Sequence, residues 1–419
     1  MQYGVSAQGA LAPLRVPDFR RLLSSNALWW QAVFMENLVV GWLVLEMTDS
    51  AWLVALTGFC RSLPLLLCGY FAGPLADRFG RRRIIVSAQA ANLTCYVATL
   101  GLLWSGQLAP WHLAAAAFGL GAAWAVDWPA RRALLPDLIG KERTVDAMLM
   151  ENFVQGCARI FGPLLAGTVV ARFGATGCYV VMALLSGMAL ATVQTLSNQP
   201  IPRTNRRPEI SPWSALGESL RYVGRSQPIL GVMLVTIVMN LLLIPYMSLL
   251  PVFARDVLHQ GPAGLGLLGA ASGIGSFLGL LLTNRLRRTI SNGWILAGGT
   301  FGASIALLVF SQSTIYGLSW ASLLAAGMGQ ACFGIMQSSI ILLTASDEMR
   351  SRTMGILVLA IGSDPLGKLQ VGALASLMGA PRAVGVQAAM AACALVVITL
   401  LLPGLRARSG PPRPVTSGD

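Results

Sequence analysis

Six ionisable residues lie inside long apolar stretches of this sequence, where charges are rare. They are Glu36, Arg61, Asp127, Arg159, Asp364 and Lys368. A charge in the interior of a lipid bilayer is costly unless it is paired or hydrated, so such residues mark ion pairs, proton sites or substrate sites. Loss of water favours the neutral form of a carboxyl group, whereas a nearby guanidinium favours its charged form. The chemistry indicated is binding and release of protons, without a covalent step.

Glu36 and Arg61 are the first candidate pair. Glu36 lies about ten residues before the outer end of the first apolar stretch, and Arg61 about ten residues after the start of the second. Antiparallel neighbouring helices would place both at one depth, which predicts an ion pair. A substrate or a conformational change could switch Glu36 between paired and protonated states, as proton coupling requires. The alternative is a permanent buried ion pair.

Asp127 and Arg159 form a second group. Asp127 lies toward the inner end of the fourth apolar stretch, and Arg159 lies in the middle of the fifth. We expect Asp127 to be an interfacial partner of Arg131 or Arg159. A role in binding protons or substrate is the alternative.

Asp364 and Lys368 are four residues apart in the eleventh apolar stretch. An acid four residues before a base is the favourable arrangement on one face of a helix. Pro365 and Gly367 between them are expected to loosen that turn. We predict a self-neutralising pair that lines a cavity.

The composition indicates that lipid is the solvent for much of the chain. Its 419 residues are 55% hydrophobic and 11% charged, whereas soluble domains carry about 25% charged residues. A membrane-spanning helix needs about 20 apolar residues, and twelve such stretches leave no room for a sizeable soluble catalytic domain. The predicted spans are 24–47, 51–75, 84–105, 111–130, 146–171, 176–196, 228–252, 263–284, 293–312, 316–343, 353–378 and 383–403. The seven cysteines show no paired spacing, so neither a disulfide framework nor a metal site is expected.

The positive residues predict the orientation of the chain. With both termini on the cytoplasmic side, 24 of the 30 Lys and Arg residues fall in inner segments and three in outer loops. Inner loops of membrane proteins carry this excess. Orientation therefore explains the net charge of +13 better than nucleic-acid binding does.

The sequence also repeats itself. GPLADRFGRRR begins at Gly73, and GLLLTNRLRRT begins 206 residues later at Gly279. This indicates two six-helix halves in parallel repeat. The predicted parts are an N-terminal half at 1–196, a cytoplasmic linker at 197–227, a C-terminal half at 228–403 and a cytoplasmic tail at 404–419. In the linker, Ser211 and Pro212 predict the start of an amphipathic helix on the inner membrane surface.

The segment that begins at Gly73 resembles the signature loop of the major facilitator superfamily, and the resemblance covers essentially the whole chain. It implies an all-α membrane protein of twelve helices that works by alternating access around a midplane site. It also implies a latch between the two halves on the cytoplasmic side. The corresponding residues are Gly73, Asp77, Arg78, Gly80 and Arg81. The second copy has Thr283 in place of the aspartate, so the latch would be asymmetric; a topology anchor is the alternative role.

Finer features resemble the branch of the superfamily that contains the enterobactin exporter and related efflux proteins. They are PARRALLPDL from Pro129, ARIFGPLLAG from Ala158 and LPVFARDVL from Leu250. Gly162, Pro163 and Gly167 also loosely resemble the glycine–proline motif of drug/proton antiporters, although close helix packing explains them as well. The arginine motif that those antiporters carry early in span four is absent.

The expected function is secondary active transport and not catalysis. We expect a proton-coupled exporter of a small amphipathic molecule, such as a drug, siderophore or metabolite, that uses a proton gradient and no cofactor. Proton-coupled uptake of a small metabolite is the alternative, and a transporter-like sensor is a third. The expected location is the bacterial inner membrane, with lipid around a monomer and no nucleic-acid partner.

Overall fold

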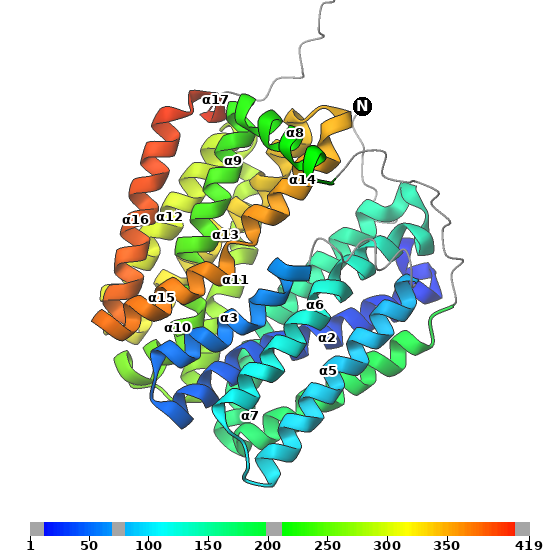
Figure 1. The fold of residues 1–419 in the computed structure, drawn as a ribbon, viewed down its shortest axis with the longest axis vertical. Coiled ribbons are helices and arrows are strands. Elements are labelled where there is room, and N and C mark those ends of the chain that lie inside the picture. The colour runs from blue at the N-terminus through cyan, green and yellow to red at the C-terminus, as the bar shows by residue number, and fades with distance from the viewer. Residues whose placement is uncertain (1–11, 69–79, 198–211, 407–419) are drawn as a thin grey trace, which may run out of the picture. The chain divides into compact units, whose positions relative to one another are not determined.

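The computed structural model describes residues 12–68, 80–197 and 212–406, and its regular structure in these ranges is helical (Figure 1). Helices satisfy their backbone hydrogen bonds within one segment, which lipid requires of a chain that crosses it. Nine helical segments in the described ranges are long and apolar enough to cross a membrane. The predicted all-α membrane class is confirmed.

The helices that precede the linker are η1 (Ala12–Arg15), α2 (Pro17–Thr48), α3 (Ala51–Cys68), α5 (Arg81–Trp104), α6 (Pro110–Ile139), η3 (Lys141–Arg143) and α7 (Thr144–Gln194). α2 begins seven residues before the predicted span at 24, because Pro17 and Asp18 suit the first turn of a helix. α7 covers two predicted spans. Its backbone breaks at Gly174, where φ is 67°, within the predicted connection between them.

The helices that follow are α8 (Pro212–Arg225), α9 (Gln227–Val238), η4 (Met239–Leu243), α10 (Tyr246–Val252), η5 (Phe253–Val257), α11 (Pro262–Leu286), α12 (Asn292–Gln312), α13 (Tyr316–Thr344), α14 (Asp347–Ile361), α15 (Asp364–Met378), α16 (Ala380–Leu401) and α17 (Pro403–Arg406). Two predicted spans are interrupted. A π-helical turn, η4, and a turn at Pro245 interrupt the predicted span 228–252. Gly362 and Ser363 separate α14 from α15.

The chain packs as two compact units. The first is drawn from the ranges Met1–Asn205 and Leu250–Ala270, and the second from Arg206–Leu249 and Ala271–Asp419. Residues 250–270 therefore belong with the first unit, although they follow the predicted linker in the sequence.

In the first unit, α2 packs along α7, and α5 packs against both α6 and α7 (Figure 1). Apolar side chains near the start of α2, the start of α5, the end of α6 and both ends of α7 form one core. Its buried members include Phe19, Leu22, Ile85, Leu134 and Val193. A second cluster lies further along α2 and contains Trp29, Trp30, Val33, Ala158 and Ala189. Packing in these two cores fixes the helices relative to one another, which positions the polar side chains described below.

In the second unit, α8 confirms the helix predicted from Pro212. Its hydrophobic side packs inward through Val223, which is buried. Arg352 of α14 donates a hydrogen bond to Glu218 at 2.6 Å, and the backbone N–H of Ser346 donates one to the Tyr222 hydroxyl at 3.1 Å. α8 is thus attached to the start of α14.

α11 and α13 of the second unit pack backbone to backbone. A Cβ atom added to Gly327 would meet the carbonyl group of Ser272, and one added to Gly275 would meet that of Leu324. Ser276 Oγ donates to the Gly327 carbonyl at 3.3 Å. Small residues allow this close approach between membrane helices.

We expect Gly327→Leu to destabilise the protein, because the added side chain must push α11 away from α13. Overpacking of this kind costs about 1–3 kcal/mol. Gly334→Leu is the matched control in α13, because a Cβ at Gly334 meets nothing within 4 Å. Thermal unfolding of the purified variants, followed by the loss of monodisperse protein, compares them. Equal melting temperatures for the two variants would contradict the predicted contact.

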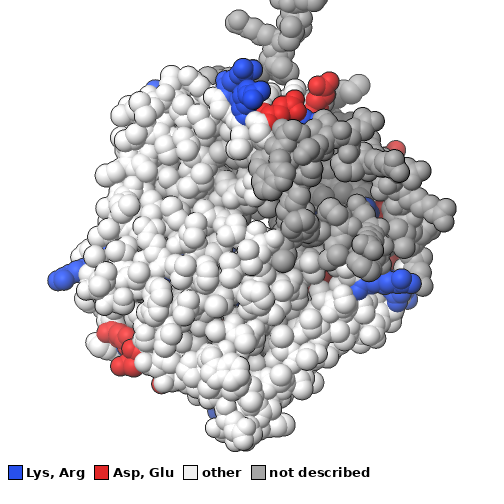
Figure 2. All heavy atoms as spheres, in the orientation of Figure 1, with Lys and Arg blue, Asp and Glu red and all other residues white. Residues whose placement is uncertain are grey.

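The surface is consistent with a lipid environment. A broad area of the face in Figure 2 shows almost no Lys, Arg, Asp or Glu side chains. Trp104 and Trp111, at the ends of α5 and α6, are among the exposed large apolar residues. Tryptophans collect at membrane–water boundaries, which fits a short connection between these helices at the membrane surface.

Candidate functional site

Glu36 of α2 and Arg61 of α3 form the ion pair predicted for them. Arg61 Nε donates to Glu36 Oε2 at 3.2 Å. The side chains are 2% and 13% exposed, so both groups are largely shielded from solvent. Gly121 of α6 packs on the Arg61 carbonyl so closely that a Cβ would not fit. α3 is therefore held against α6 at the level of the pair.

Asp127 of α6 pairs with Arg131, one of its two expected partners. Arg131 Nε donates to Asp127 Oδ1 at 2.9 Å, and Gln89 of α5 donates to the other carboxylate oxygen at 2.7 Å. The Asp127 and Arg131 side chains are 0% and 1% exposed. Arg159, the other expected partner, places its guanidinium 5.8 Å from the Phe34 ring centroid.

Asn26 of α2 and Glu151 of α7 extend this pair into a network across four helices. Arg131 Nη1 donates to Asn26 Oδ1, and Asn26 Nδ2 donates to Glu151 Oε1. We call Asn26, Gln89, Asp127, Arg131 and Glu151 the inner polar layer. Except for Asp127 and Arg131, sequence reasoning missed it. The available signal was position along the helix, because Asn26, Gln89 and Glu151 each lie about two to three turns after the start of a helix.

The predicted cytoplasmic latch is described only in part. Gly73, Asp77 and Arg78 lie outside the described residues. Gly80 has φ 88° immediately before α5, a conformation that favours glycine. Arg81 donates to Asp137 Oδ2 and to the Ala133 carbonyl, both at 2.5 Å, and so connects the start of α5 to the last turns of α6.

Asp364 and Lys368 also form their predicted pair, with Lys368 Nζ 2.9 Å from Asp364 Oδ2. The loosened turn expected between them is wrong. The break lies just before Asp364, which begins α15, because proline is tolerated in the first turn of a helix. Gly367 packs on the carbonyls of Asn240 and Leu241. The interruption in η4 therefore touches α15 beside this ion pair.

The end of the predicted seventh span meets α2 and α7 within the first unit. The Arg255 guanidinium donates to the carbonyl of Leu45 at 3.1 Å, in the last turn of α2, and pairs with Asp49. Gly167 of α7 lies against Gly266 of α11, where a Cβ on Gly167 would be 2.9 Å from the Gly266 Cα. We call this set of contacts the outer crossing. It explains why α7 carries the glycine–proline run.

Comparison with known families decides the identity of the chain. The family model described as transmembrane secretion effector matches residues 8–414. The chain belongs to this family of the major facilitator superfamily. The predicted superfamily is confirmed.

Curated proteins similar to this chain are transporters. The enterobactin exporter of Salmonella choleraesuis is 25% identical over 390 residues, which cover 92% of this chain and 91% of that protein. The staphyloferrin A transporter of Staphylococcus aureus is 22% identical over 379 residues, which cover 89% and 94%. The family and these relatives place the chain among membrane transporters and not enzymes, as predicted.

Solved transporters share the fold of this chain. A peptide transporter superposes with a TM-score of 0.76 at 12% identity, covering 93% of this chain and 94% of its own. A bacterial homologue of the human lysosomal transporter Spinster gives 0.72 at 13% identity, covering 94% and 99%. Together with the apolar helices, the family assignment makes this chain a multi-pass protein of the bacterial inner membrane.

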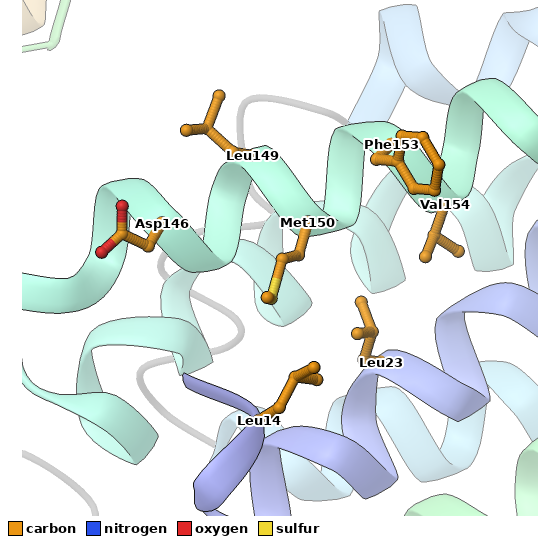
Figure 3. A pocket seen from close by; sticks show the side chains of 7 residues that line it. All are labelled: Leu14, Leu23, Asp146, Leu149, Met150, Phe153 and Val154. Atoms are coloured by element: carbon orange, nitrogen blue, oxygen red, sulfur yellow. The ribbon is translucent and has the colours of Figure 1, made fainter. Parts of the chain in front are cut away.

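A pocket of about 400 Å³ lies between the start of α2 and the start of α7. Figure 3 shows Leu14 and Leu23 facing Met150 and Val154 across it. Asp146 is the charged residue of a lining that is otherwise apolar. None of the residues predicted for proton or substrate binding lines this pocket.

Proposed function

We propose that this transporter exports a small amphipathic molecule from the cytoplasm in exchange for protons. The enterobactin exporter and staphyloferrin A transporter among its relatives support a siderophore or similar metabolite as cargo. The observation that carries proton coupling is the Glu36–Arg61 pair, in which a nearly inaccessible carboxylate accepts a hydrogen bond from the Arg61 guanidinium. Uptake of a metabolite with protons is the alternative direction.

We propose twelve membrane crossings with both termini in the cytoplasm. Nine segments of the described chain are long and apolar enough to cross. α7 is counted once among these nine, but it would cross twice, once on each side of Gly174, which makes ten. α3 and α6 supply the remaining two crossings. The excess of Lys and Arg in inner segments supports this orientation. A monomer in lipid, without nucleic acid and driven by the proton gradient instead of a cofactor, completes the proposal.

In the proposed cycle, a proton from outside neutralises Glu36 and releases it from Arg61. The freed guanidinium and the neutral carboxyl group no longer hold α2 and α3 together, which favours release of cargo to the outside. Loss of the proton to the inside restores the pair. Asp127, Arg159, Asp364 and Lys368 remain candidates for contact with protons or cargo during the same cycle.

We expect Glu36→Gln to abolish cargo-dependent proton release from acidified inside-out vesicles. The amide cannot lose a proton, so the exchange stops while the shape of the side chain is kept. Candidate cargoes are siderophores, lipophilic cations and neutral antibiotics, and a pH-sensitive dye reports the release. Glu46→Gln is the matched control, because Glu46 lies exposed in the same helix.

Each result of this assay has a clear meaning. Release that is retained in Glu36→Gln would move coupling to Asp127 or Asp364. A wild-type protein that releases no protons with any of these cargoes would contradict proton-coupled export. Accumulation of a labelled metabolite in the cytoplasmic direction, driven by protons, would favour the uptake alternative.

A further inference from the structure

Glu151 of the inner polar layer differs in its hydrogen-bond partner from Asp127 and from Glu36, the other two buried carboxylates of the candidate site. Asp127 and Glu36 each accept a hydrogen bond from a guanidinium nitrogen, at 2.9 and 3.2 Å. Glu151 is buried, at 9% exposure, and its hydrogen bond comes from the neutral amide of Asn26. Within the described chain, no cation lies within ion-pair distance of Glu151. Protonation of such a carboxylate breaks no ion pair, and burial favours its neutral form, so Glu151 is the one of the three whose protonation costs least.

Among the described residues, the charged groups that interact with Glu151 come from α6. Arg131 is joined to it through Asn26, and Asp127 lies beyond Arg131. Arg132 donates to Asn152 at 3.3 Å and lies 4.5 Å from the Trp128 ring centroid. Arg131 is thus already neutralised by Asp127, and Arg132 is bound to other groups. Glu151 can therefore change its charge without breaking the ion pair of Arg131, and Arg132 keeps its contacts with Asn152 and Trp128.

The layer also has unused hydrogen-bonding capacity. Arg131 Nη2 and Gln89 Oε1 are buried and have no hydrogen-bond partner in the described structure. Buried polar atoms that lack partners are rare and call for an explanation. A network that carries both an unused donor and an unused acceptor has a second arrangement open to it. One such arrangement brings the ionised Glu151 onto Arg131 Nη2.

We propose that Glu151 binds and releases a proton and that its charge controls the connection between α2 and α7. With Glu151 ionised, the bond from Asn26 is charge-assisted and therefore strong. With Glu151 protonated, the same bond is between neutral groups and is weaker. The proton thus loosens the inner end of α7 from α2, two helices that pack along each other.

In the transport cycle this assigns Glu151 as the proton site nearest the cytoplasm, which rests on the function proposed above. Asn26 and Glu36 are both on α2, ten residues apart, which corresponds to about 15 Å along a helix. The two carboxyl groups are therefore separate proton sites at different depths. Glu36 takes the proton in the middle of the membrane, and Glu151 passes it to the inside.

Infrared difference spectroscopy tests whether Glu151 takes up a proton, and it needs no cargo. The full chain in lipid nanodiscs is titrated from neutral to mildly acidic pH, where exposed carboxylates stay ionised. We expect one component of the protonated-carboxyl band that the wild type shows to be absent from Glu151→Gln. In Glu151→Asp this component should be present at a shifted frequency. Glu46→Gln, an exposed change in α2, should leave the band unchanged. An unchanged band in a folded Glu151→Gln protein would overturn the proposal.

The vesicle assay separates this inference from the proposed function. If the wild type releases protons with cargo, Glu151→Gln should reduce the release at least tenfold, and Glu151→Asp should restore most of it. Release of wild-type size in Glu151→Gln would overturn the role in transport. If the wild type releases none while the infrared component is lost in Glu151→Gln, the proposed function fails and the proton site on Glu151 is supported.

Discussion

Replacing Arg131 with methionine should destabilise the transporter by about 3–5 kcal/mol, because the change leaves the buried Asp127 without its cation. Asp127 is fully buried, and after the replacement its described hydrogen bond is the one from Gln89. Asn26 and Ser25 also lose the bonds that the guanidinium donates to them. Asp127→Leu should cost a similar amount, because it leaves the Arg131 charge uncompensated.

The double variant Asp127→Leu/Arg131→Met separates a broken pair from a simple loss of packing. Removal of both charges eliminates the uncompensated charge, so most of the stability should return. Thermal or chaotrope unfolding of the purified proteins measures all three variants. Glu218→Gln is a matched control, because it breaks an exposed pair with Arg352 and should change stability by at most about 1 kcal/mol. Losses that simply add in the double variant would contradict this account.

Replacing Gly167 with leucine should reduce transport by roughly 5- to 150-fold while the protein remains in the membrane. A Cβ at this position would lie 2.5 Å from the Pro262 carbonyl oxygen and 2.9 Å from the Gly266 Cα. Backbone atoms cannot move aside as a flexible side chain can. Overpacking costs about 1–3 kcal/mol, which lowers the population of the outer crossing by roughly 5- to 150-fold. In the proposed alternating-access cycle these contacts form once in each turnover, so transport should fall by a similar factor.

Gly187→Leu is the control for this substitution in the same helix, because a Cβ at Gly187 meets nothing within 4 Å. Arg255→Met should have a milder effect, within about tenfold, because its partner Asp49 is exposed and such pairs are weak. Cargo transport into vesicles, normalised to the amount of protein in the membrane, ranks the three variants. Full transport by Gly167→Leu would show that the outer crossing is not needed in the cycle.

Two ion pairs of the candidate site were predictable from local information. Asp364 and Lys368 are neighbours in one helix, so their spacing predicts their contact. Glu36 and Arg61 belong to consecutive helices joined by a short connection, and equal distance from that connection places them at one depth. In both cases the partners lie close in sequence, and few alternative arrangements exist.

The breaks in the helices were harder to predict. Pro245 and Pro365 are visible in the sequence, but proline is tolerated in some turns and disruptive in others. The backbone separates at Gly362 and Ser363 and continues through Pro365. The position of a helix break depends on which residues pack against the helix. Here Gly367, just after the break, packs on the carbonyls of Asn240 and Leu241 in η4.

Composition and spacing were sufficient to predict a helical membrane protein, because a bilayer imposes long apolar segments. The prediction of a transporter came from the resemblance of the segment that begins at Gly73 to a family signature. The inner polar layer and the outer crossing depended on packing. Asn26 and Glu151 are separated by more than a hundred residues in the sequence, and so are Leu45 and Arg255. Neither contact leaves a periodic signal in one sequence, because each exists only where helices that are distant along the chain reach the same depth with the same faces together.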